Sequence, residues 1–322
     1  MTQFSRRALL GTALAAPAIV PALAQGAWPN RPVRFIVPFA PGGPVEVPAR
    51  VVAELLSRTM GQPFIVETRP GAGGALGVQT VVQAHDPHVL LFTTSSVAIV
   101  PALMRDPGYD PLKDLTPISL VTDAPITLLA RPGGRVKDLA GLIALAREKP
   151  GEISYASSGV GSTTHLAGAL LAQKAGIDLL HVPYRGAGQA VNAVYSGDTD
   201  LLVTGTIEAI PHVRDGRLIG IAITGPRRIA PLPEVPTVGE VVPGYALTIW
   251  YGMFGPAGMD PAIATRIVAD CAPLLQGGVL KERMDASGAD LLLDGPGPLA
   301  ERLAREVPQW KAVTAAAGIR AE

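Results

Sequence analysis

The chain has 322 residues but only one cysteine, Cys271, so no intrachain disulfide can form. Aromatic residues make up 5% of the sequence, which disfavours a stacking surface for bases or sugars. The 27 basic and 27 acidic side chains balance, which argues against nucleic acid as a partner. Cys271 falls in an apolar helical spacing with Ile263, Ile267 and Leu274, which predicts core packing rather than chemistry.

Nucleotide, nucleophile and metal signatures are also missing. Thr164 stands where a dinucleotide fingerprint starting at Gly159 needs its third glycine, and the sequence contains neither a P-loop nor a G-x-S-x-G elbow. His85 and His88 are separated by Pro87 and have no cysteine or glutamate cluster nearby, which favours a surface turn over a metal site. We therefore expect neither a cofactor nor a bound metal.

The first 24 residues have the features of an export signal. Ser5-Arg6-Arg7-Ala8-Leu9-Leu10 is a twin-arginine pattern, and an apolar run interrupted by Gly11 and Pro17 follows it. Ala22-Leu23-Ala24 is a small-x-small cleavage signature. Downstream, no stretch offers about 18 uninterrupted apolar residues. The sequence predicts a twin-arginine signal peptide over residues 1–24, cleavage after Ala24 and a mature protein in a bacterial periplasm.

Strand-like and helix-like segments alternate along the rest of the chain, which predicts parallel sheets covered by helices. We expect one of these helices over Val136–Glu148 and a mainly helical region from Pro261 onward. Two long extended segments, Ile118–Ala130 and Thr248–Phe254, cross from one α/β unit to the other. This pattern predicts a two-lobed ligand clamp with a hinge. We expect residues 25–124 and 249–322 to form lobe 1 and residues 125–248 to form lobe 2.

The segment from Ser157 to Thr163 is a Gly/Ser/Thr turn between a predicted strand and a predicted helix. Ser162 or Thr163 can cap that helix, and glycines allow the backbone to approach a ligand closely. Free N–H groups at a helix start favour an anion such as phosphate, sulfate or carboxylate. An ordinary strand-to-helix turn with a conventional cap explains the same residues.

Several strings along the chain resemble one family. Among them are Trp28-Pro29-x-Arg31-Pro32-Val33-Arg34, Ile36-Val37-Pro38-Phe39-x-Pro41-Gly42-Gly43, Glu67-x-Arg69-Pro70-Gly71-Ala72-Gly73-Gly74, Tyr109-Asp110-Pro111-x-Lys113-Asp114-Leu115, His181-Val182-Pro183-Tyr184-Arg185-Gly186 and Gly255-Pro256-Ala257-Gly258. Their order and spacing resemble the receptors of tripartite tricarboxylate transporters, the Bug-type periplasmic solute-binding proteins. The resemblance implies a two-lobed, type II periplasmic binding-protein fold that binds small carboxylates without catalysis and delivers them to membrane permease subunits.

The resemblance also implies which residues line the cleft. By position, the ligand-binding residues are Phe39, Ala40, Gly42, Gly43, Pro44, Val45, Glu46, Thr94, Ser95, Ser157, Ser158, Gly161, Ser162, Thr163, His165, Tyr184 and Thr204. His165 is either a cleft residue or a packed helix residue, and His181 is expected near the cleft.

Two loops depart from the family pattern. Gly42-Gly43-Pro44-Val45-Glu46 replaces Gly-Gly-Gly/Ser-Thr-Asp, and Thr204-Gly205 replaces Asp-Asn. Fewer polar contacts favour a ligand with a larger apolar body and one anionic end. Alternatively, Pro44 caps the following helix and Glu46 points to solvent.

Two other functions remain compatible with the sequence. A hydrolase would use Ser158 or Ser162 as nucleophile and His165 or His181 as base, although no motif supports it. A ligand-sensing subunit of a signalling system would bind the same kind of ligand and dock on a signalling protein instead of a permease.

Overall fold

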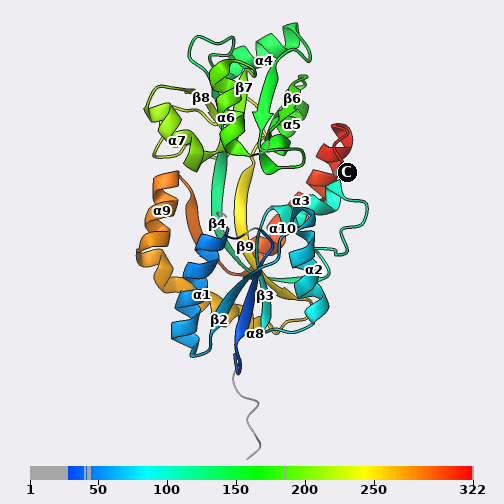
Figure 1. Ribbon diagram of the computed structural model, residues 1–322, viewed down its shortest axis with the longest axis vertical. Helices are drawn as coiled ribbons and strands as arrows, with labels where there is room; N and C mark the ends of the chain where they lie inside the picture. The colour runs from blue at the N-terminus through cyan, green and yellow to red at the C-terminus, as the bar shows by residue number, and fades with distance from the viewer. Residues whose placement is uncertain (1–27, 40, 42–44, 185, 321–322) are drawn as a thin grey trace, which may run out of the picture.

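The computed structural model describes residues 28–39, 41, 45–184 and 186–320. Two lobes lie one above the other along the long axis, and the strands β4 (Leu115–Ala130) and β9 (Thr248–Pro256) run between them (Figure 1). The predicted signal peptide lies outside the described residues. In the described part of the chain no single helix is long and apolar enough to cross a membrane, although the bent pair Pro261–Gln276 and Val279–Ser287 passes by length and composition.

The first-lobe sheet combines parallel and antiparallel strands. Its parallel strands are β1 (Val33–Val37), β2 (Phe64–Thr68) and β3 (Val89–Thr94), in the order β2-β1-β3. β9 and β4 extend the sheet antiparallel to each other, and β10 (Asp290–Asp294) pairs with the other edge of β4. β1 and β3 are rich in β-branched and aromatic residues and are largely buried on both faces, as expected for strands covered by helices.

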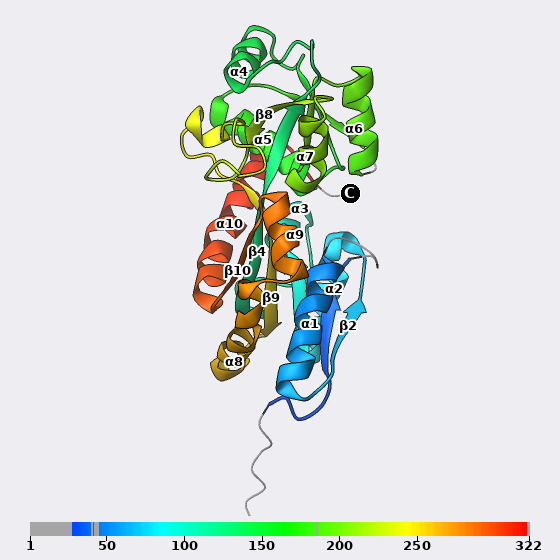
Figure 2. The same cartoon turned by 90° about the vertical axis from the view of Figure 1, so that its left-hand side faces the viewer.

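Helices cover this sheet on both faces. They are α1 (Glu46–Met60), α2 (Ala75–Ala84), α3 (Ser96–Leu103), α8 (Pro261–Cys271), α9 (Val279–Ser287) and α10 (Pro296–Ala316), with 3₁₀ turns at Ala72–Gly74 and Ala272–Gln276. Figure 2 shows α1, α8 and α9 on one side of the lobe and α10 along another edge. Cys271 is fully buried in an apolar cluster with Ile267 and Phe35, and burial raises the pKa of its thiol to about 12. This confirms the predicted packing role.

The second lobe repeats the strand–helix alternation. Its elements are α4 (Leu139–Glu148), β5 (Ser154–Ser157), α5 (Thr163–Ala175), β6 (Leu180–Pro183), α6 (Ala187–Ser196), β7 (Leu201–Gly205), α7 (Thr206–Arg214) and β8 (Ile219–Ile223), with a 3₁₀ turn at Val238–Glu240. β5, β6 and β7 are parallel, whereas β4 pairs antiparallel with β7 and β8.

β4 is shared by both lobes, which explains the geometry of the cleft. It pairs with β9 as far as Pro125, and from Ile126 onward it pairs with β7 and β8. The predicted pair of extended crossings is therefore confirmed. Because β4 runs antiparallel to β7, the carboxyl ends of the parallel strands in both lobes face each other, where ligands of open α/β sheets bind.

Three elements were not predicted. The helices α3 and α7 begin directly after β3 and β7 with almost no loop, and β10 interrupts a C-terminal region that was expected to be mainly helical. Other boundaries shift because of local caps. The helix expected from residue 136 begins at Leu139, since the Asp138 side chain accepts a hydrogen bond from the N–H of Gly141.

Candidate functional site

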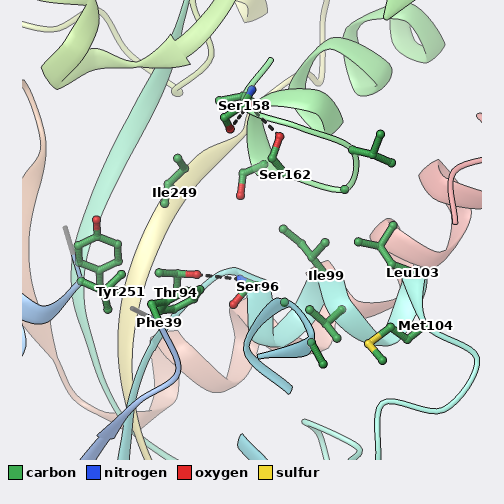
Figure 3. Close-up of a pocket in the computed structure, with 18 residues that line it drawn as sticks. Phe39, Thr94, Ser96, Ile99, Leu103, Met104, Ser158, Ser162, Ile249 and Tyr251 are labelled. Atoms are coloured by element: carbon green, nitrogen blue, oxygen red, sulfur yellow. Dashed lines mark hydrogen bonds between the residues drawn. The ribbon is translucent and has the colours of Figure 1, made fainter. Parts of the chain in front are cut away.

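A cavity of about 760 Å³ lies between the lobes, at the facing strand ends. Its described lining is Phe39, Val45, Ala72, Gly73, Thr94, Ser96, Ile99, Val100, Leu103, Met104, Ser158, Val160, Gly161, Ser162, Thr163, Thr164, Ile249 and Tyr251. In Figure 3 the hydroxyls of Ser158 and Ser162 lie above the space, while Thr94, Ser96 and Tyr251 lie below it. None of the described lining residues carries a charged side chain, so polar recognition here depends on hydroxyls and backbone amides.

The second-lobe side of this cavity is a turn held together by its own hydroxyls. Ser162 caps α5: its Oγ accepts from the His165 N–H at 3.2 Å and donates to the Gly159 carbonyl at 2.7 Å. Thr164 Oγ1 accepts the Ser158 N–H at 3.1 Å and lies 2.9 Å from the hydroxyls of Ser158 and Ser162. The turn is therefore preorganised before any ligand arrives.

The start of α5 still has unused donors. Within the described residues, the N–H groups of Thr163 and Thr164 and the Thr163 hydroxyl make no hydrogen bond. The prediction that Ser162 or Thr163 caps the helix is confirmed for Ser162. Gly161 fits at the turn because its φ of +75° disfavours other residues, and because an added Cβ would lie 2.8 Å from Leu103 of the opposite lobe.

The first-lobe side of the cavity is the start of α3. Thr94 Oγ1 accepts the Ser96 N–H at 3.1 Å, and both side chains line the space. Ser95, predicted to bind ligand, is 1% exposed, and its hydroxyl has no hydrogen-bond partner in the described structure. Its neighbour Ser96 takes the lining position because α3 begins there. Two helix starts, α3 and α5, thus face the same cavity and favour an anion.

Within the first-lobe loop, Val45 lines the cavity and Glu46 does not. Glu46 is buried at the start of α1, where its carboxylate accepts hydrogen bonds from the Arg50 guanidinium. The alternative in which Glu46 points to solvent is therefore wrong. Ala40, Gly42, Gly43 and Pro44 lie outside the described residues, so their predicted ligand contacts stay predictions.

His165 and His181 lie behind the second-lobe turn, away from the cavity. The Gly161 N–H donates to His165 Nδ1 at 3.0 Å, and His181 Nε2 shares a hydrogen bond of 2.7 Å with Ser157 Oγ. Both imidazoles face a separate pocket that is also lined by Val313 of α10. Burial lowers the pKa of His165 to about 3, with a further contribution from His181, and burial lowers the pKa of His181 to about 4.

The hydrogen bonds of these serines and histidines argue against the hydrolase alternative. Among the described residues, neither Ser158 nor Ser162 hydrogen-bonds to an imidazole, and the Ser–His pair that does form uses Ser157, which is fully buried. That arrangement lacks the accessible nucleophile with an adjacent base that the mechanism requires.

The His85–His88 segment is a turn as predicted, with His88 buried against Trp28, and no group of three or more possible metal ligands occurs in the described chain.

The structure thus brings together part of the predicted set. Phe39, Val45, Thr94, Ser158, Gly161, Ser162 and Thr163 line the 760 Å³ cavity, and Thr204 lines a second, adjoining one of about 520 Å³. Ser95, Ser157, His165, Tyr184 and Glu46 line neither. The apolar wall formed by Ile99, Val100, Leu103 and Met104 was missed, because apolar side chains carry no chemical signal in a sequence.

A two-lobed α/β protein with a preorganised cleft between opposing strand ends has the architecture of a periplasmic solute-binding protein. Residues 48–316 match the model of the tripartite tricarboxylate transporter family receptor, and the chain belongs to that family. The family resemblance inferred from the sequence is confirmed. Members are substrate-binding receptors of the periplasm.

Three relatives illustrate the match. Protein BugT of Bordetella pertussis is 33% identical over 321 residues, covering 97% of each chain. The structure of the periplasmic binding protein BugD is 32% identical with a TM-score of 0.72, over 92% of this chain and all of BugD. MatC from Rhodopseudomonas palustris with bound malate is 31% identical with a TM-score of 0.72, covering 88% of this chain and 99% of MatC.

Proposed function

We propose that the protein captures a small carboxylate-containing ligand in the cleft between its lobes and delivers it to the membrane permease subunits of a tripartite transporter. One observation carries this proposal. Hydroxyls at the starts of α3 and α5, together with free amides at the start of α5, converge from opposite lobes on an otherwise apolar cavity of about 760 Å³. Such a cavity has the size and mixed lining of a small-molecule site, and MatC holds malate in a structure of the same fold.

The proposed lobes are residues 25–124 with 249–322, and residues 125–248. The change in the pairing of β4 between Pro125 and Ile126 supports this division, because β4 leaves β9 there and continues as a strand of the second-lobe sheet. We also propose periplasmic export through residues 1–24, with cleavage after Ala24. The twin-arginine and Ala22-Leu23-Ala24 patterns, together with the location of family members, support this part of the proposal.

A thermal-shift panel of dicarboxylates, aromatic acids, branched acids and amino acids tests the binding proposal. A ligand at about 100 times its dissociation constant adds roughly 2.7 kcal/mol of stability, which is easily detected. Calorimetry on the strongest hit then gives a dissociation constant. If no carboxylate stabilises the protein at millimolar concentration, the proposed ligand class is wrong.

The contacts of the second-lobe turn are tested by substitution. Thr163→Val removes a hydroxyl that makes no hydrogen bond among the described residues, and it keeps the side-chain shape and the Ser162 cap. A hydrogen bond to a charged group contributes about 1.5–3 kcal/mol, so affinity should fall about tenfold or more if this hydroxyl contacts the anion. Unchanged affinity in a Ser158→Ala/Ser162→Ala/Thr163→Ala variant would exclude the turn from the site.

A further inference from the structure

The cavity that adjoins the main one has a different chemical character. It measures about 520 Å³, shares Ser158, Thr164, Ile249 and Tyr251 with the main cavity, and lies between α7 of one lobe and α9 of the other. The hydroxyl of Thr206 donates to the Ser287 carbonyl at 2.7 Å and connects these two helices beside it. The wall includes apolar groups from Pro48, Ala124, Pro125, Ile207, Met284 and Ala289.

Two opposite charges line this adjoining cavity, one from each lobe. Glu208 comes from α7 and Arg283 from α9, and neither forms an ion pair in the described structure. Both residues are exposed at this cavity, and partial desolvation raises the pKa of the Glu208 carboxyl. The Tyr251 phenol, whose pKa is raised to about 12 by burial and then by the charge of Glu208, makes no hydrogen bond among the described residues.

The position of the Glu208 carboxylate depends on Gly205. A Cβ added at residue 205 would lie 2.6 Å from Glu208 Oε2, although the backbone there, with φ −62° and ψ 150°, accepts any residue. Glycine at residue 205 therefore leaves room for this position of the carboxylate, and a Cβ there would shift the flexible end of Glu208. The glycine allows the carboxylate to fold back over the carboxyl end of β7, at the cleft edge.

A purely structural role explains only part of this arrangement. An acidic residue in the first turn of a helix is favourable, and Glu208 does hydrogen-bond to its own backbone N–H. That role accounts neither for the opposed Arg283 nor for the phenol of Tyr251 that faces the same space. A ligand with a positive and a negative group on an apolar body satisfies all three.

We propose that Glu208 and Arg283 make the cleft selective for a zwitterion, an amino acid with a branched or aromatic side chain. Glu208 binds its ammonium group, and Arg283 together with the hydroxyls shared by the two cavities binds its carboxylate. This inference rests on the proposed carboxylate-binding function and narrows its ligand class. Glu208 and Arg283 are then specificity-determining residues contributed by opposite lobes.

Matched ligands that differ only in the amino group test the inference by calorimetry. The pairs are phenylalanine with 3-phenylpropionate, and leucine with 4-methylpentanoate. The amino acid should bind at least about tenfold more tightly than its deaminated analogue. Glu208→Gln should abolish that difference by weakening only the amino acid, whereas Arg283→Gln should weaken both members of a pair.

Gly205→Ala provides a second route to the same outcome, because it displaces the carboxylate without removing it. Gly188→Ala, on a helix where an added Cβ meets nothing within 4 Å, and Glu148→Gln, on the exposed end of α4, are the controls. Tighter binding of the deaminated acids, or an equal loss for both ligands in Glu208→Gln, would overturn the zwitterion inference while leaving carboxylate binding intact. Failure of every carboxylate to bind would instead overturn the proposed function.

Discussion

The imidazole rings of His165 and His181 stack face to face, with ring centroids 3.6 Å apart and an interplanar angle of 6°. Each ring also hydrogen-bonds to the second-lobe turn that lines the cavity, His165 through the Gly161 N–H and His181 through Ser157. His165 Nδ1 can accept that hydrogen bond only when it carries no proton. Two charged rings at this distance would repel each other, so the turn depends on neutral imidazoles.

Stability should therefore fall as the pH drops from 7 to 5. Both folded-state pKa values, about 3 and about 4, lie below the ordinary value of 6.5, so the unfolded chain takes up protons first. Each imidazole that takes up a proton on unfolding contributes a slope of up to about 1.4 kcal/mol per pH unit to the free energy of unfolding. The stabilisation is fully present above pH 6.5 and is lost as the pH falls towards the folded-state pKa. Urea denaturation at several pH values measures the slope.

The His165→Asn/His181→Gln variant should flatten this profile. Asparagine places an acceptor near the Nδ1 position and glutamine places a polar group near Nε2, and neither side chain titrates in this range. His85→Asn, at an exposed turn of the first lobe, is the control. An unchanged pH slope in the double variant would show that other groups cause the acid sensitivity.

Arg302 connects α10 to both strands that cross between the lobes. Its Nη1 donates to Asp123 of β4 at 2.7 Å, its Nε donates to Glu306 at 2.7 Å, and its Nη2 bonds the Thr248 hydroxyl of β9. Glu306 in turn accepts from Trp250 Nε1 at 2.9 Å. We predict that Arg302→Leu lowers the free energy of unfolding by about 3–5 kcal/mol, because it leaves two poorly exposed carboxylates without their cation.

Chemical denaturation measures this loss, and Arg305→Leu, an exposed arginine on the same helix, should change stability by less than about 0.5 kcal/mol. Adding Asp123→Asn and Glu306→Gln to Arg302→Leu should recover part of the loss, since the unpaired charges are then gone. A loss below about 1 kcal/mol for Arg302→Leu would mean that water replaces the guanidinium at little cost.

The sequence predicted the layout of the sheet better than it predicted some of its helices. The crossing strands were visible as long extended, mainly apolar runs, and the paired βα order followed from the alternation of strand-like and helix-like segments. The helices α3 and α7 were not predicted because each starts directly after a strand and contains a proline, Pro101 or Pro211, which masks the helical pattern. β10 was not predicted because β4, the strand that it pairs with in the described structure, is distant in sequence.

The site was predictable where a local signal exists. Ser162 was recognisable as a helix cap because capping involves residues three apart in sequence. The orientation of the His165 side chain was not predictable from the sequence, since it depends on α10 packing behind the turn. The shared cavity of Glu208 and Arg283 was not predictable either, because these residues line it only through the arrangement of the two lobes by β4 and β9.

Export should depend on the twin-arginine pattern. Replacing Arg6 and Arg7 with lysine keeps the charge but removes the paired guanidinium groups, so the precursor should remain in the cytoplasm. Fractionation followed by mass spectrometry of the periplasmic form measures both localisation and the expected new N-terminus at Gln25. Normal periplasmic accumulation of the variant would refute the twin-arginine route but not the location.

The last prediction concerns the ligand's apolar body. Val45 contributes a branched apolar side chain to the lining of the main cavity, as do Phe39 and Ile249, while proline at residue 44 provides no backbone donor. We expect the protein to bind branched or aromatic monocarboxylates, including their amino acids, more tightly than succinate or glutamate. In Pro44→Gly/Val45→Thr, which restores an N–H and adds a hydroxyl of similar volume, succinate should gain about tenfold in affinity.

Calorimetry with succinate, glutamate, phenylalanine, 3-phenylpropionate and leucine measures this change in preference. The variant leaves Glu46 in place, because its carboxylate pairs with Arg50 and helps to position the start of α1. Val52→Thr, a buried position on α1 outside the cavity, controls for the loss of stability that a buried hydroxyl causes. Tight binding of succinate or glutamate by the wild type, with no detectable binding of the apolar acids, would show that polar groups outside this loop dominate selectivity. The predicted dependence on Pro44 and Val45 would then be wrong.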